Sequence, residues 1–389
     1  MTVSSKYFKS NILQNRLSPI LKWAGGKEQE LKHIHPMIPR KFNRYYEPFV
    51  GGGAVYFSIN SKEMFINDKS YELIDLYKII KNQDELFFNS VEEMIYNWKL
   101  LEIIVLNNSN ELINIYLDFS SNIVDELYLN NWILEFTIRH SEEFNGMLKT
   151  NFNINLDNFI KEIKKNLLNK IKRMKKIELE KGKLPTNDIL DNIEASLKSA
   201  FYMHFRYLYN NIKKYNIEKS KEVAIFFFIR NFAYSGMFRY NKKGDFNVPY
   251  GGIGYNRKNL SKKLNYLKSK ELNQHLLKTT IENLDFKDFL NKYTLTKNDF
   301  IFLDPPYDSD FSTYAKNEFT RDDQTRLANY LIKECKAKWM MIIKNTDFIF
   351  DLYNKNNIYI TLFDKKYLVS FQNRNNKNTK HLLIRNYND

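Results

Sequence analysis

The chain has 389 residues, a formal net charge of +15 and 43% apolar residues, enough for one large domain with an insertion or for two domains. This positive charge suggests a polyanionic partner such as nucleic acid. An AT-rich genome would also enrich Lys, Asn and Ile and could account for part of the charge. A single cysteine, Cys335, excludes a disulfide framework and a cysteine metal cluster. Because the longest apolar run, 223–229, cannot cross a bilayer and the N-terminus lacks a signal-peptide core, we expect a cytoplasmic protein.

The first motif is a glycine turn within residues 19–31. Gly25 and Gly26 permit a tight turn, after which a helix is expected. A phosphate loop is excluded, since residues 21 and 28 are not the Gly and Ser or Thr which that motif requires. The turn would place Trp23 and Lys27 beside one small ligand. An ordinary turn with a buried tryptophan remains the alternative.

A second glycine motif lies within residues 45–57. A short strand leads into the triple glycine 51–53, and an apolar helix is expected to follow. This order resembles the glycine loop of a dinucleotide or nucleoside site. A second strand, residues 64–67, ends at Asp68. An acid at this position, about 20 residues after a glycine loop, is placed to bind ribose hydroxyls.

The middle of the chain has a different character. A helix is expected at 71–83, and residues 84–220 then lack glycine-rich loops. Within them, 159–183 alternates lysines with Ile, Leu and Met, which predicts one or two amphipathic basic helices. The charged face is either simply solvated or contacts phosphates. No internal repeat is present.

An aromatic and basic segment follows an apolar helix expected at 222–229. Residues 230–252 interleave Arg, Asn, Tyr, Phe and Gly outside any regular period. Such a loop or hairpin suits nucleic-acid reading, because Arg and Asn bond base edges and aromatic rings wedge into a stack. A β-hairpin without this role remains open.

The last third of the chain predicts several strands. These are 279–282, followed by Asp285 and Phe286, then 338–344, and a terminal antiparallel pair of 358–363 with 381–384. Thr320 and Asp323 form a capping box for a helix that runs to about residue 335. Loops are expected at 309–319 and 372–380. The six histidines lack ligand spacing, so no metal site is expected.

The stretch Phe300 to Tyr307 carries the chemistry. An apolar run typical of a buried strand ends in Asp304, Pro305, Pro306 and Tyr307. A carboxylate and the rigid Pro305 carbonyl could hold the two hydrogens of an amino group on a nucleobase, while Tyr307 stacks on a base flipped from its helix. The alternative is a strand that ends in a Pro-Pro turn without such a role.

Together these motifs resemble the Dam-type (alpha-class, D12) DNA adenine-N6 methyltransferases. The shared motifs lie in the family's order and reach both ends of the chain. They are Leu-Lys-Trp-Ala-Gly-Gly-Lys at 21–27, Glu-Pro-Phe-Val-Gly-Gly-Gly at 47–53, Asn-Asp at 67–68, Arg-Tyr-Asn and Phe-Asn-Val-Pro within 239–249, and Asp-Pro-Pro-Tyr at 304–307.

The resemblance implies a Rossmann-like α/β fold with a seven-stranded sheet. Residues 1–84 and 270–389 would form the catalytic domain that binds S-adenosylmethionine, and 85–269 an inserted, mostly helical target-recognition domain. The implied cofactor-binding residues are Trp23, Lys27, Phe49, Gly51, Gly53, Asp68, Asp285, Phe286 and Asp304. The implied DNA-binding residues are Arg230, Asn231, Arg239, Tyr240, Asn241 and Asn247.

The implied function is methylation of N6 of an adenine in double-stranded DNA, as the modification enzyme of a restriction–modification system. A monomer is expected, with any cognate restriction endonuclease acting separately. Because residues 84–220 exceed the corresponding region of compact members, and Ser235 to Phe238 replace a commoner Asn-Gly-Leu-Cys-like run, recognition of GATC does not follow. The alternatives are an RNA or protein amino-group methyltransferase, a DNA-binding relative without catalysis, and a nucleotide-dependent enzyme.

Overall fold

The computed structural model describes residues 11–13, 17–23, 25–148, 150–307, 319–366 and 378–388. The loops expected at 309–319 and 372–380 lie almost wholly outside these residues. The chain divides into two compact units, one of residues 1–81 with 269–389 and the other of 82–268. No helix in the described ranges is long and apolar enough to cross a membrane.

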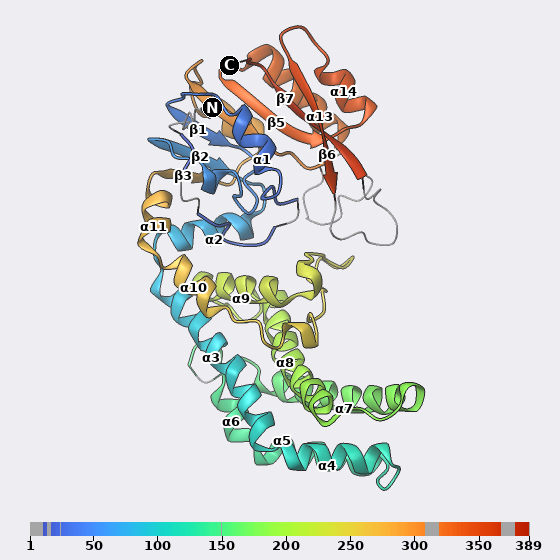
Figure 1. Cartoon of the computed structure of the whole chain (residues 1–389). Helices are drawn as coiled ribbons and strands as arrows, with labels where there is room; N and C mark the ends of the chain where they lie inside the picture. Colours follow the sequence, from blue (N-terminus) through green and yellow to red (C-terminus); the bar gives the residue numbers. More distant parts are fainter. Residues whose placement is uncertain are drawn as a thin grey trace, which may run out of the picture. The chain divides into compact units, whose positions relative to one another are not determined.

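The first unit contains a seven-stranded mixed sheet (Figure 1). Its strand order is β3-β2-β1-β4-β5-β7-β6. The first five strands in this order are parallel, and β7 is antiparallel to both β5 and β6. This confirms the expected Rossmann-like α/β sheet with a terminal antiparallel pair. The strands are β1 (Arg44–Glu47), β2 (Glu63–Asn67), β3 (Thr279–Glu282), β4 (Asp299–Leu303), β5 (Lys338–Lys344), β6 (Tyr359–Lys366) and β7 (Asn378–Arg385).

The centre of the sheet is apolar because its strands are covered on both faces. Every residue of β4 is buried, as are the five inner residues of β5. Trp339, Ile301 and Leu327 belong to one buried cluster under this part of the sheet. The helices of the unit are α1 (Leu31–Ile34), α2 (Tyr71–Lys81), α11 (Lys270–Leu277), α12 (Phe286–Asn291), α13 (Arg321–Asn329) and α14 (Asp347–Tyr353).

The second unit is mostly helical (Figure 1). Its longest helix, α7, is the expected amphipathic basic helix in a single piece. One stripe of α7 is buried, formed by Phe159, Ile163, Leu167, Ile171 and Met174. The helices are α3 (Glu85–Asn107), α4 (Ser109–Ser120), α5 (Glu126–Arg139), α6 (Ser141–Gly146), α7 (Leu156–Lys181), α8 (Thr186–Asn210), α9 (Lys219–Phe232) and α10 (Ser261–Leu267).

Two expected helices are shorter than the sequence indicated. After the triple glycine the chain makes only a 3₁₀ turn at Tyr56–Ser58, since Ile59 is already extended and bridges to Ile12. After Gly26, α1 has four residues and passes into a 3₁₀ turn that contains Pro36. The expectation of a full helix after the triple glycine was therefore wrong.

Candidate active site

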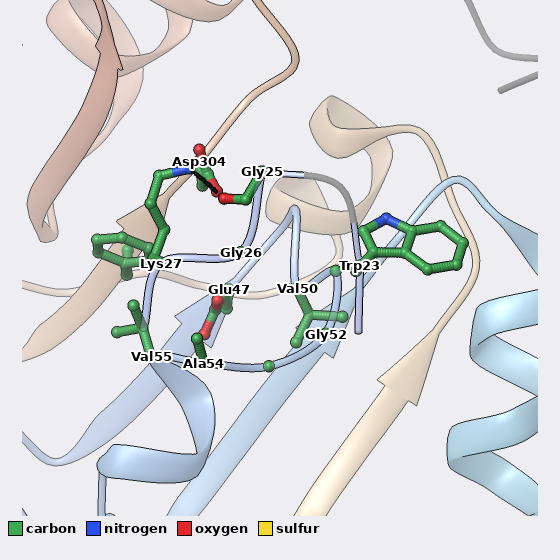
Figure 2. Close-up of a pocket in the computed structure, with 13 residues that line it drawn as sticks. Trp23, Gly25, Gly26, Lys27, Glu47, Val50, Gly52, Ala54, Val55 and Asp304 are labelled. Carbon is green, nitrogen blue, oxygen red and sulfur yellow. Dashed lines mark hydrogen bonds and ion pairs between the residues drawn. The ribbon is translucent and has the colours of Figure 1, made fainter. Parts of the chain in front are cut away.

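A pocket lies where the parallel strands β1 and β4 end (Figure 2). It brings together five predicted residues: Trp23, Lys27, Gly51, Gly53 and Asp304. They come from segments far apart in the sequence, namely the Gly25 turn, the loop after β1 and the end of β4. Such a convergence at the carboxyl edge of a parallel sheet is typical of ligand sites in α/β proteins.

Lys27 and Asp304 form a close ion pair in this pocket. The Lys27 ammonium donates to Asp304 Oδ2 at 2.5 Å and to the Gly25 carbonyl at 2.7 Å. Figure 2 shows the two side chains pointing toward one another. The Lys27 side chain is 3% exposed and that of Asp304 20%, so the pair is shielded from water on one side. The ammonium lies beside the Asp304 carboxylate, whose oxygens are hydrogen-bond acceptors.

Glu47, the last residue of β1, is a pocket residue that was not predicted as a site residue. Its side chain is 2% exposed and accepts a hydrogen bond of 2.6 Å from the Tyr45 hydroxyl. Burial raises the pKa of Glu47 well above its usual range. Its signal in the sequence was an acid at the end of an apolar strand, the same pattern that identified Asp304.

Asp68 lies beside the triple glycine. Its Oδ2 accepts from the Gly51 N–H at 3.0 Å, and its Oδ1 from the Ser70 N–H at 2.9 Å. The preceding Asn67 donates to the Pro48 and Leu284 carbonyls and so ties together the loops after β1 and β3. Burial raises the pKa of Asp68 to about 6.

The triple glycine is required by the protein's own packing. A Cβ on Gly51 would lie 3.1 Å from the Trp23 ring. One on Gly53, whose φ is +82°, would lie 2.5 Å from the Tyr77 hydroxyl and 2.7 Å from the Phe57 ring. The loop therefore lies directly against these side chains, in a conformation that L-residues rarely adopt.

Phe49, Asp285 and Phe286 form a neighbouring cluster. The rings of Phe49 and Phe286 are 5.7 Å apart, and Phe286 is only 4% exposed. Asp285 caps α12 through the Lys287 N–H and forms an ion pair of 2.8 Å with Arg326. The cluster is thus held by internal contacts, and Phe286 offers little surface to a ligand.

The Asp304 to Tyr307 segment is fixed from several directions. Pro305 is buried and Pro306 exposed. Gln324 of α13, itself fully buried, donates to the Pro306 carbonyl at 2.8 Å. The Tyr307 hydroxyl lies 3.2 Å from His381 Nε2, and the Lys27 ammonium 5.6 Å from the centre of the Tyr307 ring. Gln324 and His381 had no signal in the sequence, because their role depends on which segments meet.

The predicted DNA-binding residues all lie in the second unit. The segment after α9 contains two isolated antiparallel bridges, Ala233 to Tyr250 and Tyr240 to Phe246, and forms a short irregular hairpin. Arg239 is exposed, and its Nε donates to Asn247 Oδ1 at 3.0 Å. Asn241 shapes the turn by accepting from the N–H groups of residues 243 and 245.

Two of these residues form hydrogen bonds within the second unit. Arg230 is 3% exposed and donates to the carbonyls of Gly236 and Met237, so it supports the hairpin from inside. Asn231 lies in α9 and donates to the Phe227 carbonyl. In this conformation Arg230 is almost fully buried, and its contact with DNA stays a prediction.

The amino-acid sequence matches a protein family and several known proteins. The chain fits the D12 class N6 adenine-specific DNA methyltransferase model over residues 23–195 and 152–362. A Type II methyltransferase, M.CviBI, from Paramecium bursaria Chlorella virus NC1A is 27% identical over 378 residues, which cover 95% of this chain and 100% of that protein.

Other relatives carry related names. The Type II methyltransferase M.MjaIII of Methanocaldococcus jannaschii is 27% identical over 88% of this chain and 90% of its own. A DNA adenine methylase of Haemophilus influenzae is 23% identical over 86% and 82%, respectively. The family model covers well over half of the chain, and the family's reaction requires a methyl donor. The chain therefore belongs to the D12 class of N6 adenine-specific DNA methyltransferases.

Proposed function

We propose that this DNA adenine methyltransferase takes its methyl group from S-adenosylmethionine and transfers it to N6 of an adenine flipped out of double-stranded DNA. We further propose that it acts as a monomer and as the modification enzyme of a restriction–modification system, with any restriction endonuclease working separately. The role as a modification enzyme is supported by two relatives that are named Type II methyltransferases.

The observation that carries the proposal is the placement of Asp304. It follows a fully buried strand, precedes the stiff Pro305 and lies 2.5 Å from the ammonium of Lys27. A carboxylate held in this way accepts hydrogen bonds without having to reorient. In the described residues no donor is bonded to the adjacent Pro305 carbonyl, so a second acceptor lies beside the carboxylate.

The pocket fits S-adenosylmethionine by the chemistry of its side chains. Carboxyl groups offer acceptors to the cationic and hydroxylated parts of that molecule. Glu47 and Asp304 line the pocket, and Asp68 is bonded to the N–H of its residue Gly51. The half-buried rings of Trp23 and Phe49 suit an adenine ring, and the buried Phe286 supports Phe49, with the two ring centres 5.7 Å apart. We assign the cofactor to these residues together with Lys27, Gly51, Gly53 and Asp285.

In this assignment S-adenosylmethionine supplies a methyl group that its sulfonium centre has already activated. No covalent protein nucleophile is required. Asp304 and the Pro305 carbonyl accept the two hydrogens of the adenine amino group, which frees the nitrogen lone pair from the ring. Tyr307 stacks on the base, and Pro306 keeps the segment rigid. Most of the acceleration comes from positioning and electrostatics.

For DNA contact we propose Arg239, Tyr240, Asn241 and Asn247 of the hairpin. Arg239 is exposed and Asn247 is its hydrogen-bond partner, so the pair can exchange that bond for one to a base edge or a phosphate. The Tyr240 hydroxyl lies 3.2 Å from that of Tyr209, which anchors the ring at the hairpin.

Acidification is expected to weaken S-adenosylmethionine binding, with a midpoint near the Asp68 pKa of about 6. Above this pH the ionised carboxylate accepts bonds from ribose hydroxyls, and below it the protonated group accepts less well. Calorimetric titration across this range measures the effect. Asp68→Asn should bind more weakly with a flat profile; an unchanged pH dependence in that variant contradicts the assignment.

Titration of Asp68 would not unfold the protein at the pH values where S-adenosylmethionine binding weakens. Because folding raises the pKa of Asp68 above its ordinary value, this group favours the folded state most at pH values below that ordinary value. The contribution is lost as the pH rises through about 6. For Asp68, binding and folding therefore change in opposite directions with pH, and a parallel melting series separates them.

Replacing Gln324 with leucine is expected to slow methyl transfer about tenfold while changing cofactor affinity less than about twofold. The leucine removes the donor that holds the Pro306 carbonyl, so Asp304 and Tyr307 lose part of their orientation. Single-turnover rates and cofactor titrations measure the two effects. Thr325→Val, which removes a hydroxyl bonded to the Arg321 carbonyl on the same helix, is the control. Equal losses in rate and affinity contradict a positioning role.

The proposal as a whole is tested with labelled S-adenosylmethionine and random-sequence duplex DNA, with each modified position mapped. N6-methyladenine in one recurring short sequence is the expected result. Transfer to RNA or protein, with none to DNA, overturns the assignment of substrate.

A further inference from the structure

A basic groove lies between α5 and α7 of the second unit, away from the recognition hairpin in the sequence. It is lined by Asn130 of α5 and by residues from the first half of α7, including Lys161, Lys164, Lys165 and Asn169. One acid, Asp157 in the first turn of α7, also lines it. Three lysines and two amides thus face one concave surface.

The register of α7 explains why these lysines share a surface. The buried stripe that begins with Phe159, Ile163 and Leu167 packs α7 against its neighbours, with α8 beside it in Figure 1. Lys161, Lys164 and Lys165 fall off that stripe. Residues three and four apart on a helix are neighbours, so the ammonium groups gather along one side.

The groove lysines differ from other lysines of the same helix in their partners. Among the residues described, neither Lys161 nor Lys164 lies within 4 Å of a carboxylate, and Lys165 is 3.7 Å from Glu162. By contrast, Lys172 forms an ion pair of 2.7 Å with Glu126. The positive charge of the groove is therefore poorly neutralised within the protein.

Other basic residues of α7 also lie close to one another. Further along α7, burial and the nearby Arg173 lower the pKa of Lys170. Like charges held together on a rigid helix raise the energy of the free protein. Binding a polyanion relieves that repulsion and releases counterions.

We propose that the α5–α7 groove binds the sugar–phosphate backbone of the DNA substrate through Lys161, Lys164 and Lys165. This rests on the proposed action on duplex DNA and adds a second contact to that of the recognition hairpin. Lysine ammonium groups position a duplex but do not read its sequence. The groove therefore contributes affinity that is independent of sequence, while Arg239 and its neighbours contribute discrimination.

The test compares Lys161→Gln/Lys164→Gln with Lys172→Gln/Lys183→Gln. The second pair is a matched control on and just after the same helix, because Lys172 and Lys183 already pair with Glu126 and Glu178. Affinity of the full-length protein for a duplex of about 30 base pairs is measured by fluorescence anisotropy, at about 50 to 200 mM salt. Each lost phosphate contact makes the slope of log K against log salt less negative by about 0.9.

The slope of the groove variant should therefore be less negative by about 1.8. Between the lowest and the highest salt concentration, its affinity should fall by a factor about ten times smaller than that of the wild type. The loss of affinity should be equal for duplexes with and without the sequence that the enzyme methylates. The control pair should keep the wild-type slope. An unchanged slope in a groove variant that melts like the wild type overturns the proposal. A loss of affinity that is confined to duplexes with the target sequence, or to RNA, also overturns it.

Wild-type methyl transfer to the same duplex is recorded alongside. Absence of that transfer refutes the proposed function, whereas the slopes address only the groove. The two failures are therefore distinguishable.

Discussion

Replacing Asp304 with alanine is expected to lower the rate of methyl transfer at least about a thousandfold. The variant loses the carboxylate that accepts an amino hydrogen of adenine in the proposed mechanism, and no other residue that lines the pocket has the same position at the end of β4. Single-turnover transfer at saturating cofactor and DNA measures the chemical step. Retention of more than about a tenth of the rate contradicts a catalytic role for Asp304.

A loss of stability must be separated from this loss of chemistry. Alanine at 304 leaves the Lys27 ammonium, 3% exposed, without the carboxylate it pairs with at 2.5 Å. Removing one partner of a buried pair costs about 3–5 kcal/mol, whereas removing both is often far milder. The control is therefore Lys27→Met/Asp304→Ala, which should melt closer to the wild type than Asp304→Ala and remain inactive. Activity in this double variant would show that the carboxylate is dispensable.

The sequence was most informative where a strand ends in a polar residue. Strands β3 and β5 have the predicted bounds, Thr279–Glu282 and Lys338–Lys344. The apolar run of β5 is bounded by lysines, and β3 ends at the acidic Glu282, so the end of each strand was fixed locally. The same logic found Asp68 and Asp304, because parallel strands place their carboxyl ends at one edge.

What the sequence did not reveal are the pairings between distant segments. Lys27 and Asp304 are 277 residues apart, and Gln324 reaches Pro306 across 18. No local pattern specifies that these atoms meet. Lys27, which the sequence predicts as a cofactor contact, is thus also the ion-pair partner of Asp304.

Residue type alone also did not reveal which side chains are buried. Arg230 stands in a segment rich in Arg, Asn and Tyr, which is typical of nucleic-acid contact, yet it lies on the last turn of an apolar helix and is buried. Its guanidinium binds two carbonyls of the following turn. Arg239, nine residues later in the same segment, is exposed.

Replacing Gly53 with alanine is expected to destabilise the first unit by about 3–5 kcal/mol, which lowers its melting temperature by ~10 °C. Two effects combine. The φ of +82° is unfavourable for any L-residue, by about 1–2 kcal/mol, and the new Cβ would lie 2.5 Å from the Tyr77 hydroxyl and 2.7 Å from the Phe57 ring. Since Tyr77 also donates to the Gly51 carbonyl, the loop must shift and cofactor affinity should fall with stability.

Gly25→Ala separates the two effects within the same unit. Gly25 has a similar φ of +76°, but a Cβ there would meet only the Lys27 ammonium, at an ordinary 3.9 Å. Thermal unfolding of this variant should therefore show the backbone cost alone, about 1–2 kcal/mol. If Gly53→Ala is no less stable than Gly25→Ala, the close packing of the loop against Tyr77 and Phe57 is not what requires a glycine there. A larger loss at Gly53 instead assigns that glycine to the contact between the triple-glycine loop and α2, the element that carries Tyr77.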